Sequence, residues 1–134
     1  MYVPTDDLKR YKEEHPEAYK GIFPEEPSVH RNKALMDIES LDDNWNHNGA
    51  KHFSKDLIEK CEKMLPDFHV TPAIFPTAAE SIQMEWEKEN GDYLEIEVFL
   101  DRCVVFKRYN NGDCSGYEAT DKELKNIVKD FFDK

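Results

Sequence analysis

The chain has 134 residues, with 18 Lys and Arg against 29 Asp and Glu, so its formal net charge is −11. Hydrophobic residues make up 39% and aromatic residues 12% of the chain, which excludes an intrinsically disordered acidic tail. The length is that of one domain. Because such a charge repels phosphate groups, we expect neither nucleic acid nor a membrane as a partner.

The cysteines and the N-terminal residues indicate the compartment. The three cysteines, Cys61, Cys103 and Cys114, lack C-x-x-C spacing, so neither a disulfide framework nor a zinc ribbon is expected. Cys114, in an exposed-looking loop, has no signature spacing to a histidine, which disfavours a catalytic thiol. The N-terminus has neither the basic nor the apolar segment of a secretory signal. We therefore expect reduced thiols and a cytoplasmic protein.

The first third of the chain divides into an arm and the start of a domain. Residues 1–27 contain four prolines and a short helix that Thr5 can cap, so we expect an arm that packs on a single α+β domain of residues 28–134. Ser28 can cap a second helix, whose apolar residues recur at helical spacing. These apolar residues are Ala34, Leu35, Ile38 and Leu41.

A loop and a further helix follow. Residues 44–53 are rich in residues that favour turns. Ser54 then begins a helix that Pro66 ends. Its apolar residues Leu57, Ile58, Cys61, Met64 and Leu65 fall on one face. This amphipathic pattern requires a second apolar surface on which the helix can pack.

From residue 81 the apolar pattern changes to a period of two, which is typical of half-buried strands. Ile82, Met84 and Trp86 alternate with polar residues, and so do Leu94, Ile96 and Val98. A two-residue turn would place Trp86 opposite Glu95, on the wrong face of the sheet. We therefore expect a three-residue turn, Asn90-Gly91-Asp92, that pairs Trp86 with Ile96 on the buried face.

The remaining elements complete a two-layer fold. Residues 67–80 predict at most a short edge strand, and a third strand runs from Cys103 to Tyr109. Thr120 and Glu123 form a capping box before a last helix. The apolar stripe of this helix is Leu124, Ile127, Val128, Phe131 and Phe132. The sequence therefore predicts an α+β fold, with a three- to four-stranded antiparallel meander packed against helices that precede and follow it.

The acidic residues gather in one stretch, residues 67–101, which carries a net charge of −8. In the expected hairpin, Glu85 lies opposite Glu97 and Glu87 lies opposite Glu95, all on the face away from the core. One interpretation is a solvated face that keeps the protein soluble. The other is a surface that binds a basic protein partner. A divalent-metal site is the least favoured, because no ligand loop is present.

The loop around Trp45 is a second candidate site. Beside Trp45 it contains the potential metal ligands Asp42, Asp43, His47 and His52. Clusters of histidine and carboxylate can bind zinc or iron, but this spacing matches no metal motif, so we expect neither a metal nor a cofactor. In the structural interpretation, Trp45 buries its ring and Gly49 adopts a positive φ in the turn.

Several segments of the chain follow one another in a characteristic order. They are Trp45-Asn46-His47-Asn48-Gly49-Ala50, Ser54, a helix to Leu65-Pro66, Phe75-Pro76-Thr77 and Ile82-Gln83-Met84-Glu85-Trp86. This order, over about residues 41–100, resembles an uncharacterised family of small acidic bacterial and phage proteins with a W-[DN]-G-x-G-A-x-x-x-S loop, a helix and an I-x-[LM]-E-[WY] strand. The chain departs from the pattern at His47, where Gly is usual. The resemblance implies a bacterial or phage origin and a compact α+β domain, and no catalytic residues.

These observations favour a non-enzymatic protein-interaction module. Glu85, Glu87, Glu95 and Glu97 would present an acidic sheet face to a basic protein partner, as in an antitoxin-, immunity- or inhibitor-like protein. The alternative is an enzyme that uses a small ligand or a metal at Trp45, His47 and His52. A further alternative is a structural subunit of a homo-oligomer, and the sequence is compatible with a monomer or a small homo-oligomer.

Overall fold

The computed structural model describes residues 32–133. The expected N-terminal arm, with Thr5 as a cap, and the expected cap Ser28 lie outside these residues. The elements are α3 (Lys33–Glu39), α4 (Lys55–Met64), the 3-10 turn η1 (Leu65–Asp67), β1 (Ala73–Pro76), β2 (Ile82–Glu87), β3 (Tyr93–Val98), β4 (Cys103–Arg108), β5 (Cys114–Ala119) and α5 (Asp121–Asp133).

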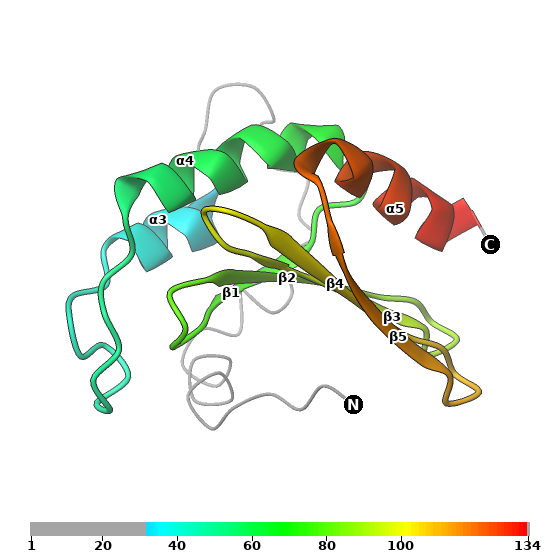
Figure 1. Ribbon diagram of the computed structural model, residues 1–134, viewed down its shortest axis with the longest axis horizontal. Coiled ribbons are helices and arrows are strands. Elements are labelled where there is room, and N and C mark those ends of the chain that lie inside the picture. Colours follow the sequence, from blue (N-terminus) through cyan, green and yellow to red (C-terminus); the bar gives the residue numbers. More distant parts are fainter. Residues whose placement is uncertain (1–31, 134) are drawn as a thin grey trace.

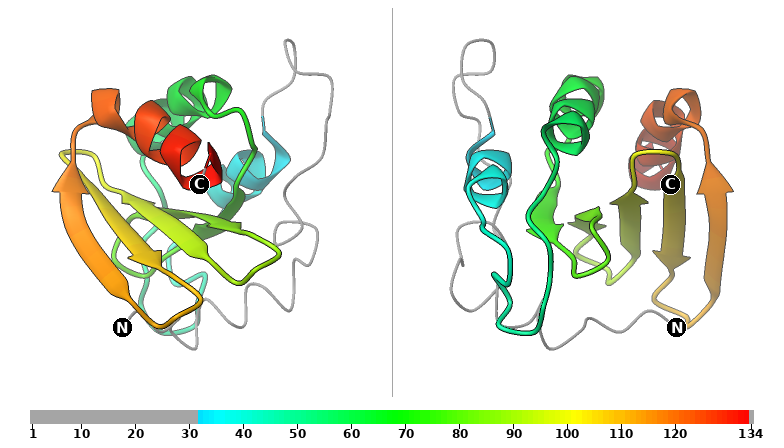
Figure 2. Two further views of the ribbon diagram at one scale, coloured as in Figure 1. Left: turned by 90° about the vertical axis from the view of Figure 1, so that its right-hand side faces the viewer. Right: turned by 60° about the vertical axis from the view of Figure 1, so that its left-hand side comes forward.

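The strands form one antiparallel sheet of five strands in the order β1-β2-β3-β4-β5. The three described helices lie on one face of this sheet (Figures 1 and 2). The expected α+β class and the sequential strand order are confirmed, with more strands than the expected three to four. We call the face toward the helices the inner face and the opposite face the outer face.

The additional strand is β5, whose first residues we had expected to form a loop. Its residues Cys114–Glu118 are exposed and only Ala119 is buried. A strand that buries neither face needs no alternation of apolar and polar residues, so the period-two signal is missing. Pairing with β4, from Cys103 opposite Ala119 to Arg108 opposite Cys114, is what makes this segment a strand.

The helices bury the apolar stripes that the sequence predicts. Ser54 accepts a hydrogen bond from the Leu57 amide at 3.2 Å and so caps α4 as expected. The cap of α3 is Asn32, whose Oδ1 accepts from the Leu35 amide at 3.1 Å. Asn32 has an extended backbone, with ψ of 128°, so the helix begins after it. None of the described helices is long and apolar enough to span a bilayer.

The β2–β3 hairpin has an odd turn, one residue earlier than expected. The Lys88 amide donates to the Asp92 carbonyl, and the Gly91 amide donates to the Lys88 carbonyl, each at 2.9 Å. Gly91, with φ of 94°, supplies the left-handed position of a three-residue turn, Glu89-Asn90-Gly91. Trp86 and Ile96 are 3% and 0% exposed, so the expectation that they share the buried face is confirmed.

The predicted pairing across this hairpin is wrong by two residues. Trp86 lies opposite Leu94, and Met84 lies opposite Ile96. A turn that moves by one residue changes the register by two, which keeps every side chain on its face but gives it a new neighbour. On the outer face, Glu85 therefore lies opposite Glu95, Gln83 opposite Glu97 and Glu87 opposite Tyr93.

Two polar side chains connect parts of the fold that are distant in sequence. Lys60 of α4 donates to the carbonyls of Phe99 and Leu100, at 2.6 and 3.1 Å, in the β3–β4 turn. Its Nζ also lies 3.7 Å from the Asp121 carboxylate at the start of α5. Asp92 accepts from the Asn110 amide at 2.9 Å and so joins the β2–β3 turn to the β4–β5 turn.

The last helix begins at Asp121, directly after Thr120. Glu123 accepts hydrogen bonds from the amide and the hydroxyl of Thr120, both at 2.9 Å. These bonds hold the pKa of Glu123 below its ordinary value, the backbone bond being the larger cause. Phe131 is 4% exposed in the core, as expected for the apolar stripe.

Replacing Thr120 with Ala should destabilise the protein by about 0.5 to 1 kcal/mol, because the hydroxyl bond to Glu123 is lost while the amide bond remains. Thr120→Ser keeps the hydroxyl and is the matched control. Chemical denaturation of the three proteins measures the difference. Equal stability of Thr120→Ala and the wild type would contradict a stabilising role of the hydroxyl bond to Glu123.

Replacing Gly91 with Ala should cost about 1 to 2 kcal/mol, because its φ of 94° is unfavourable for a residue with a Cβ. Gly116→Ala is the control, since Gly116 has no positive φ and a Cβ there would lie 3.7 Å from the Val105 carbonyl oxygen, an ordinary contact. Thermal unfolding compares the two variants. An equal effect of both substitutions would contradict the assigned turn.

Candidate functional site

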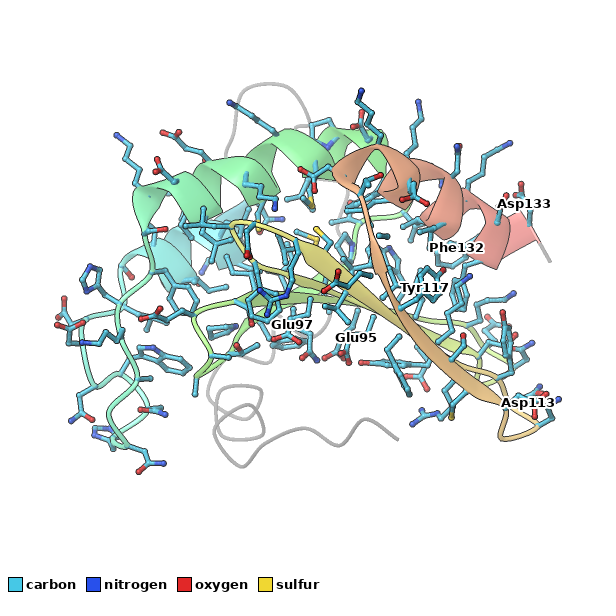
Figure 3. All side chains as sticks on the ribbon, in the orientation of Figure 1. Glu95, Glu97, Asp113, Tyr117, Phe132 and Asp133 are labelled. Carbon is cyan, nitrogen blue, oxygen red and sulfur yellow. The ribbon has the colours of Figure 1, made fainter. Side chains whose placement is uncertain are left out.

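The four predicted partner-binding glutamates lie on the outer face, but they do not form one solvated patch. Glu85 and Glu95 are 8% and 4% exposed, Glu97 is half-buried and Glu87 is exposed. Figure 3 shows Glu95 and Glu97 beneath the sheet, on the side away from the helices. The expectation of a fully solvated acidic face is therefore wrong for Glu85 and Glu95.

The outer face contains apolar side chains that a simple alternation does not predict. Phe75 of β1 is fully buried there, and Val104 and Phe106 of β4 are half-buried. Glu95 lies directly between Glu85 and Phe106 in the sheet. The sequence does contain a signal for apolar residues on the outer face. It is the unbroken apolar run of residues 103–106, which is typical of a strand that is buried on both faces.

Glu85, Glu95 and Glu97 each accept a hydrogen bond from an uncharged side chain. The Tyr93 hydroxyl donates to Glu95 at 2.7 Å, and the Gln83 amide donates to Glu85 at 2.5 Å. The Ser81 hydroxyl donates to Glu97 at 2.5 Å. These bonds orient the carboxylates. Glu85 and Glu95 lie opposite each other, and like charges in such a pair destabilise a sheet by a few tenths up to about 1 kcal/mol.

The accessible part of the outer face combines acidic and apolar side chains. We call Glu87, Glu97, Val104 and Phe106 the outer patch. Glu97 lies directly beside Val104 in the β3–β4 pairing, and Phe106 is two residues further along the same strand. Glu87, at the end of β2, borders the same face and is exposed. The outer patch therefore has two half-buried apolar residues on β4, with the carboxylates of Glu97 and Glu87 on the neighbouring strands β3 and β2.

The Trp45 loop is organised by its own hydrogen bonds. The Trp45 indole donates to the Lys51 carbonyl at 3.1 Å, and its ring lies 6.0 Å from the Phe53 ring. The buried Asn46 side chain accepts from the amides of Asn48 and Ala50, at 2.9 and 3.0 Å. Gly49 has the expected positive φ of 85°. These contacts support the structural interpretation of the loop.

Of the potential metal ligands in this loop, the structure brings His52 and Asp43 together. His52 Nδ1 lies 2.7 Å from Asp43 Oδ1, which also accepts from the His52 amide at 2.9 Å. His47 is exposed and has a positive φ of 59°, so it occupies a turn position. Among residues 32–133, no three His, Cys, Asp or Glu side chains come close enough together to hold a metal ion.

A hollow of about 250 Å³ adjoins this loop. Its lining residues are Lys51, His52, Phe53, Ser54, Leu57, Glu80 and Leu100. Leu100 is 56% exposed and His52 is mostly exposed, so the hollow is open to solvent. The Ser54 hydroxyl is already used as the cap of α4, which leaves the hollow without a positioned nucleophile from that residue.

The cysteines differ in environment. Burial raises the pKa of Cys61 and of Cys103 to about 12, so both are protonated thiols at neutral pH. Cys114 is exposed on β5, where the sequence predicted an exposed loop. All three are free thiols, as expected.

No protein-family model, curated protein or solved structure matches this chain. The resemblance of residues 41–100 to small bacterial and phage proteins therefore stays a prediction.

The bonds between Asp43 and His52 generate a pH prediction. The His52 amide is the larger cause and the ring the second cause of the lowered pKa of Asp43. Because the folded pKa lies below the unfolded one, the stabilisation of the loop is present above the ordinary aspartate range and is lost as the pH falls through the lowered value. NMR titration of the Asp43 carboxyl measures this pKa directly.

In His52→Ala the pKa of Asp43 should rise only part of the way, because the backbone bond remains. In wild-type protein, the protection of the His52 amide against exchange, relative to the intrinsic exchange rate at the same pH, should fall as Asp43 is protonated. An Asp43 carboxyl that titrates in the ordinary range in the folded protein would contradict these bonds.

Proposed function

We propose that this protein is a non-enzymatic interaction module that binds a basic, partly apolar segment of another protein on the outer patch. The observation that supports this most is the arrangement of Glu87, Glu97, Val104 and Phe106 on one face of the sheet. No described helix covers this face (Figure 1). A segment that has Lys or Arg to one side of an apolar residue matches this arrangement.

The two kinds of side chain act at different stages of binding. Residues 67–101 carry a net charge of −8, so their field attracts a basic partner and accelerates the first encounter. Burial of Val104 and Phe106 against an apolar residue then slows dissociation. Exposed carboxylates alone would give fast but weak binding, because salt screens them.

A bacterial or phage antitoxin-, immunity- or inhibitor-like protein is the class that we propose. Such proteins neutralise another protein by occupying its surface, for which a small acidic domain is sufficient. The proposed partner is a basic protein.

The test is a double charge reversal, Glu87→Lys with Glu97→Lys, compared with Glu59→Lys and Asp130→Lys on exposed positions of the helices. Both pairs change the net charge equally, so only the first alters the outer patch. Wild type and both variants are used to capture proteins from the native host, and the association rate of any captured basic protein is then measured against salt concentration.

The outer-patch reversal should slow association by about tenfold and flatten its dependence on salt, because charges at the rim act through long-range attraction. The control reversal should have a smaller effect. Thermal unfolding of both variants establishes that they are folded. If the wild type and the outer-patch variant capture the same proteins, the proposal is overturned.

A further inference from the structure

β5 is an open edge of the sheet. Its residues Cys114–Glu118 are all exposed, and it is the outermost strand in the right-hand view of Figure 2. At the other edge, every residue of β1 (Ala73–Pro76) is buried, and Pro76 has no amide hydrogen. Within residues 32–133, the edge that can accept another strand is therefore that of β5.

The hydrogen bonds of the β4–β5 turn show which backbone groups of β5 point outward. The Tyr109 amide donates to the Asp113 carbonyl at 2.8 Å, so these two residues form a hydrogen-bonded pair. Bonded and non-bonded pairs alternate along an antiparallel ladder, so Ser115, Tyr117 and Ala119 bond to β4. The N–H and C=O groups of the alternate residues, Cys114, Gly116 and Glu118, point away from the sheet.

β5 lacks the features that normally prevent strand addition. Its segment Cys114–Ala119 contains no proline and no lysine, and its pairing with β4 runs without a bulge. Gly116, which has no side chain, stands at the centre of the three outward residues. Side chains of a strand point above and below the sheet, so the outward N–H and C=O groups of β5 are accessible to a second strand.

We propose that β5 pairs antiparallel with β5 of a second copy of this chain, about a two-fold axis at Gly116. Gly116 then faces Gly116 of the partner subunit, and Cys114 faces Glu118 of the partner subunit. Among the symmetric registers, this one places all three outward residues of both copies in hydrogen-bonded pairs. A register moved by two residues leaves one of the three outside the ladder in each copy.

Charge complementarity across this pairing supports a second copy as the occupant. Arg108 lies beside Cys114 in the β4–β5 pairing, on the outer face. Glu118 of the partner subunit lies on the other side of Cys114, about 10 Å from Arg108 between Cα atoms. In the single chain the Arg108 guanidinium lies over the Tyr93 ring, 5.1 Å from its centroid, and Glu118 lies 3.8 Å from Arg102 Nε. Both side chains are long enough to turn toward each other over the small cysteine when the strands pair, and the two-fold axis repeats the pair.

The inner face also suits the pairing. Tyr117 is 39% exposed, and in this register it lies opposite Ser115 of the partner subunit, which covers part of its ring.

Helix α5 does not cover the edge of β5. Its Phe131 carbonyl accepts from Lys88 at 2.9 Å and its Phe132 ring lies 5.6 Å from His69, so the helix runs from β5 toward β2. The two sheets therefore join into one, with both helical layers on the same side.

Sedimentation equilibrium of the full chain from about 1 to 100 µM tests the proposal. The wild type should form dimers that dissociate on dilution. Gly116→Pro removes an outward N–H without removing a bond to β4, and it should reduce dimerisation at least tenfold. Gly116→Ala keeps the N–H and should remain dimeric. A wild type that is monomeric over the whole range would overturn the proposal, as would a dimer that Gly116→Pro leaves unchanged.

A cross-linking variant tests the register and decides the matter if Gly116→Pro fails to fold. In Glu118→Cys, the new thiol should form a disulfide with Cys114 of the partner subunit under mild oxidation, because directly opposed residues have Cα atoms about 5.5 Å apart. Within one chain these positions are about 13 Å apart along the strand, too far for a disulfide. Adding Cys114→Ser should abolish the covalent dimer. The absence of a covalent dimer in Glu118→Cys would overturn the proposal.

Discussion

The rest of the structure depends on the odd number of residues in the β2–β3 turn. The apolar residues of both strands alternate with polar ones, and only an odd turn brings both apolar sets to the same face. That face is the surface on which α3, α4 and α5 bury their stripes. Trp86 on this face makes specific contacts: its indole donates to the Val70 carbonyl at 2.7 Å, and its ring makes an edge-to-face contact with the Phe68 ring. An even turn would have divided the apolar surface between the two faces.

Polar contacts then hold the two layers together in one arrangement. Lys60 bonds to the carbonyls of the β3–β4 turn and lies near Asp121, so it connects α4, the sheet and the start of α5. Lys88 connects the end of β2 to the end of α5 through the Phe131 carbonyl. Apolar burial supplies most of the stability of such a domain but is not directional, so these bonds contribute to a unique packing of helices on the sheet.

The outer face and the β5 edge are separate surfaces with different chemistry. Val104 and Phe106 offer apolar area on the outer face, and Glu87 and Glu97 offer charge. The edge of β5 offers backbone N–H and C=O groups, which bind another strand through main-chain hydrogen bonds. Binding at one surface does not require the other, so a dimer through β5 would carry two outer patches. Two linked sites bind a partner that itself has two sites more tightly than either site alone.

The sequence by itself determined the helices, their apolar stripes and the parity of the hairpin, because these follow from local periodicity and from caps such as Ser54. It did not determine the register, since the position of the turn depends on which residue takes the left-handed conformation, here Gly91. It also missed β5, which is a strand only through its pairing with β4. Only the tertiary structure decided that Glu85 and Glu95 are buried, because burial depends on the apolar neighbours that other strands bring to the same face.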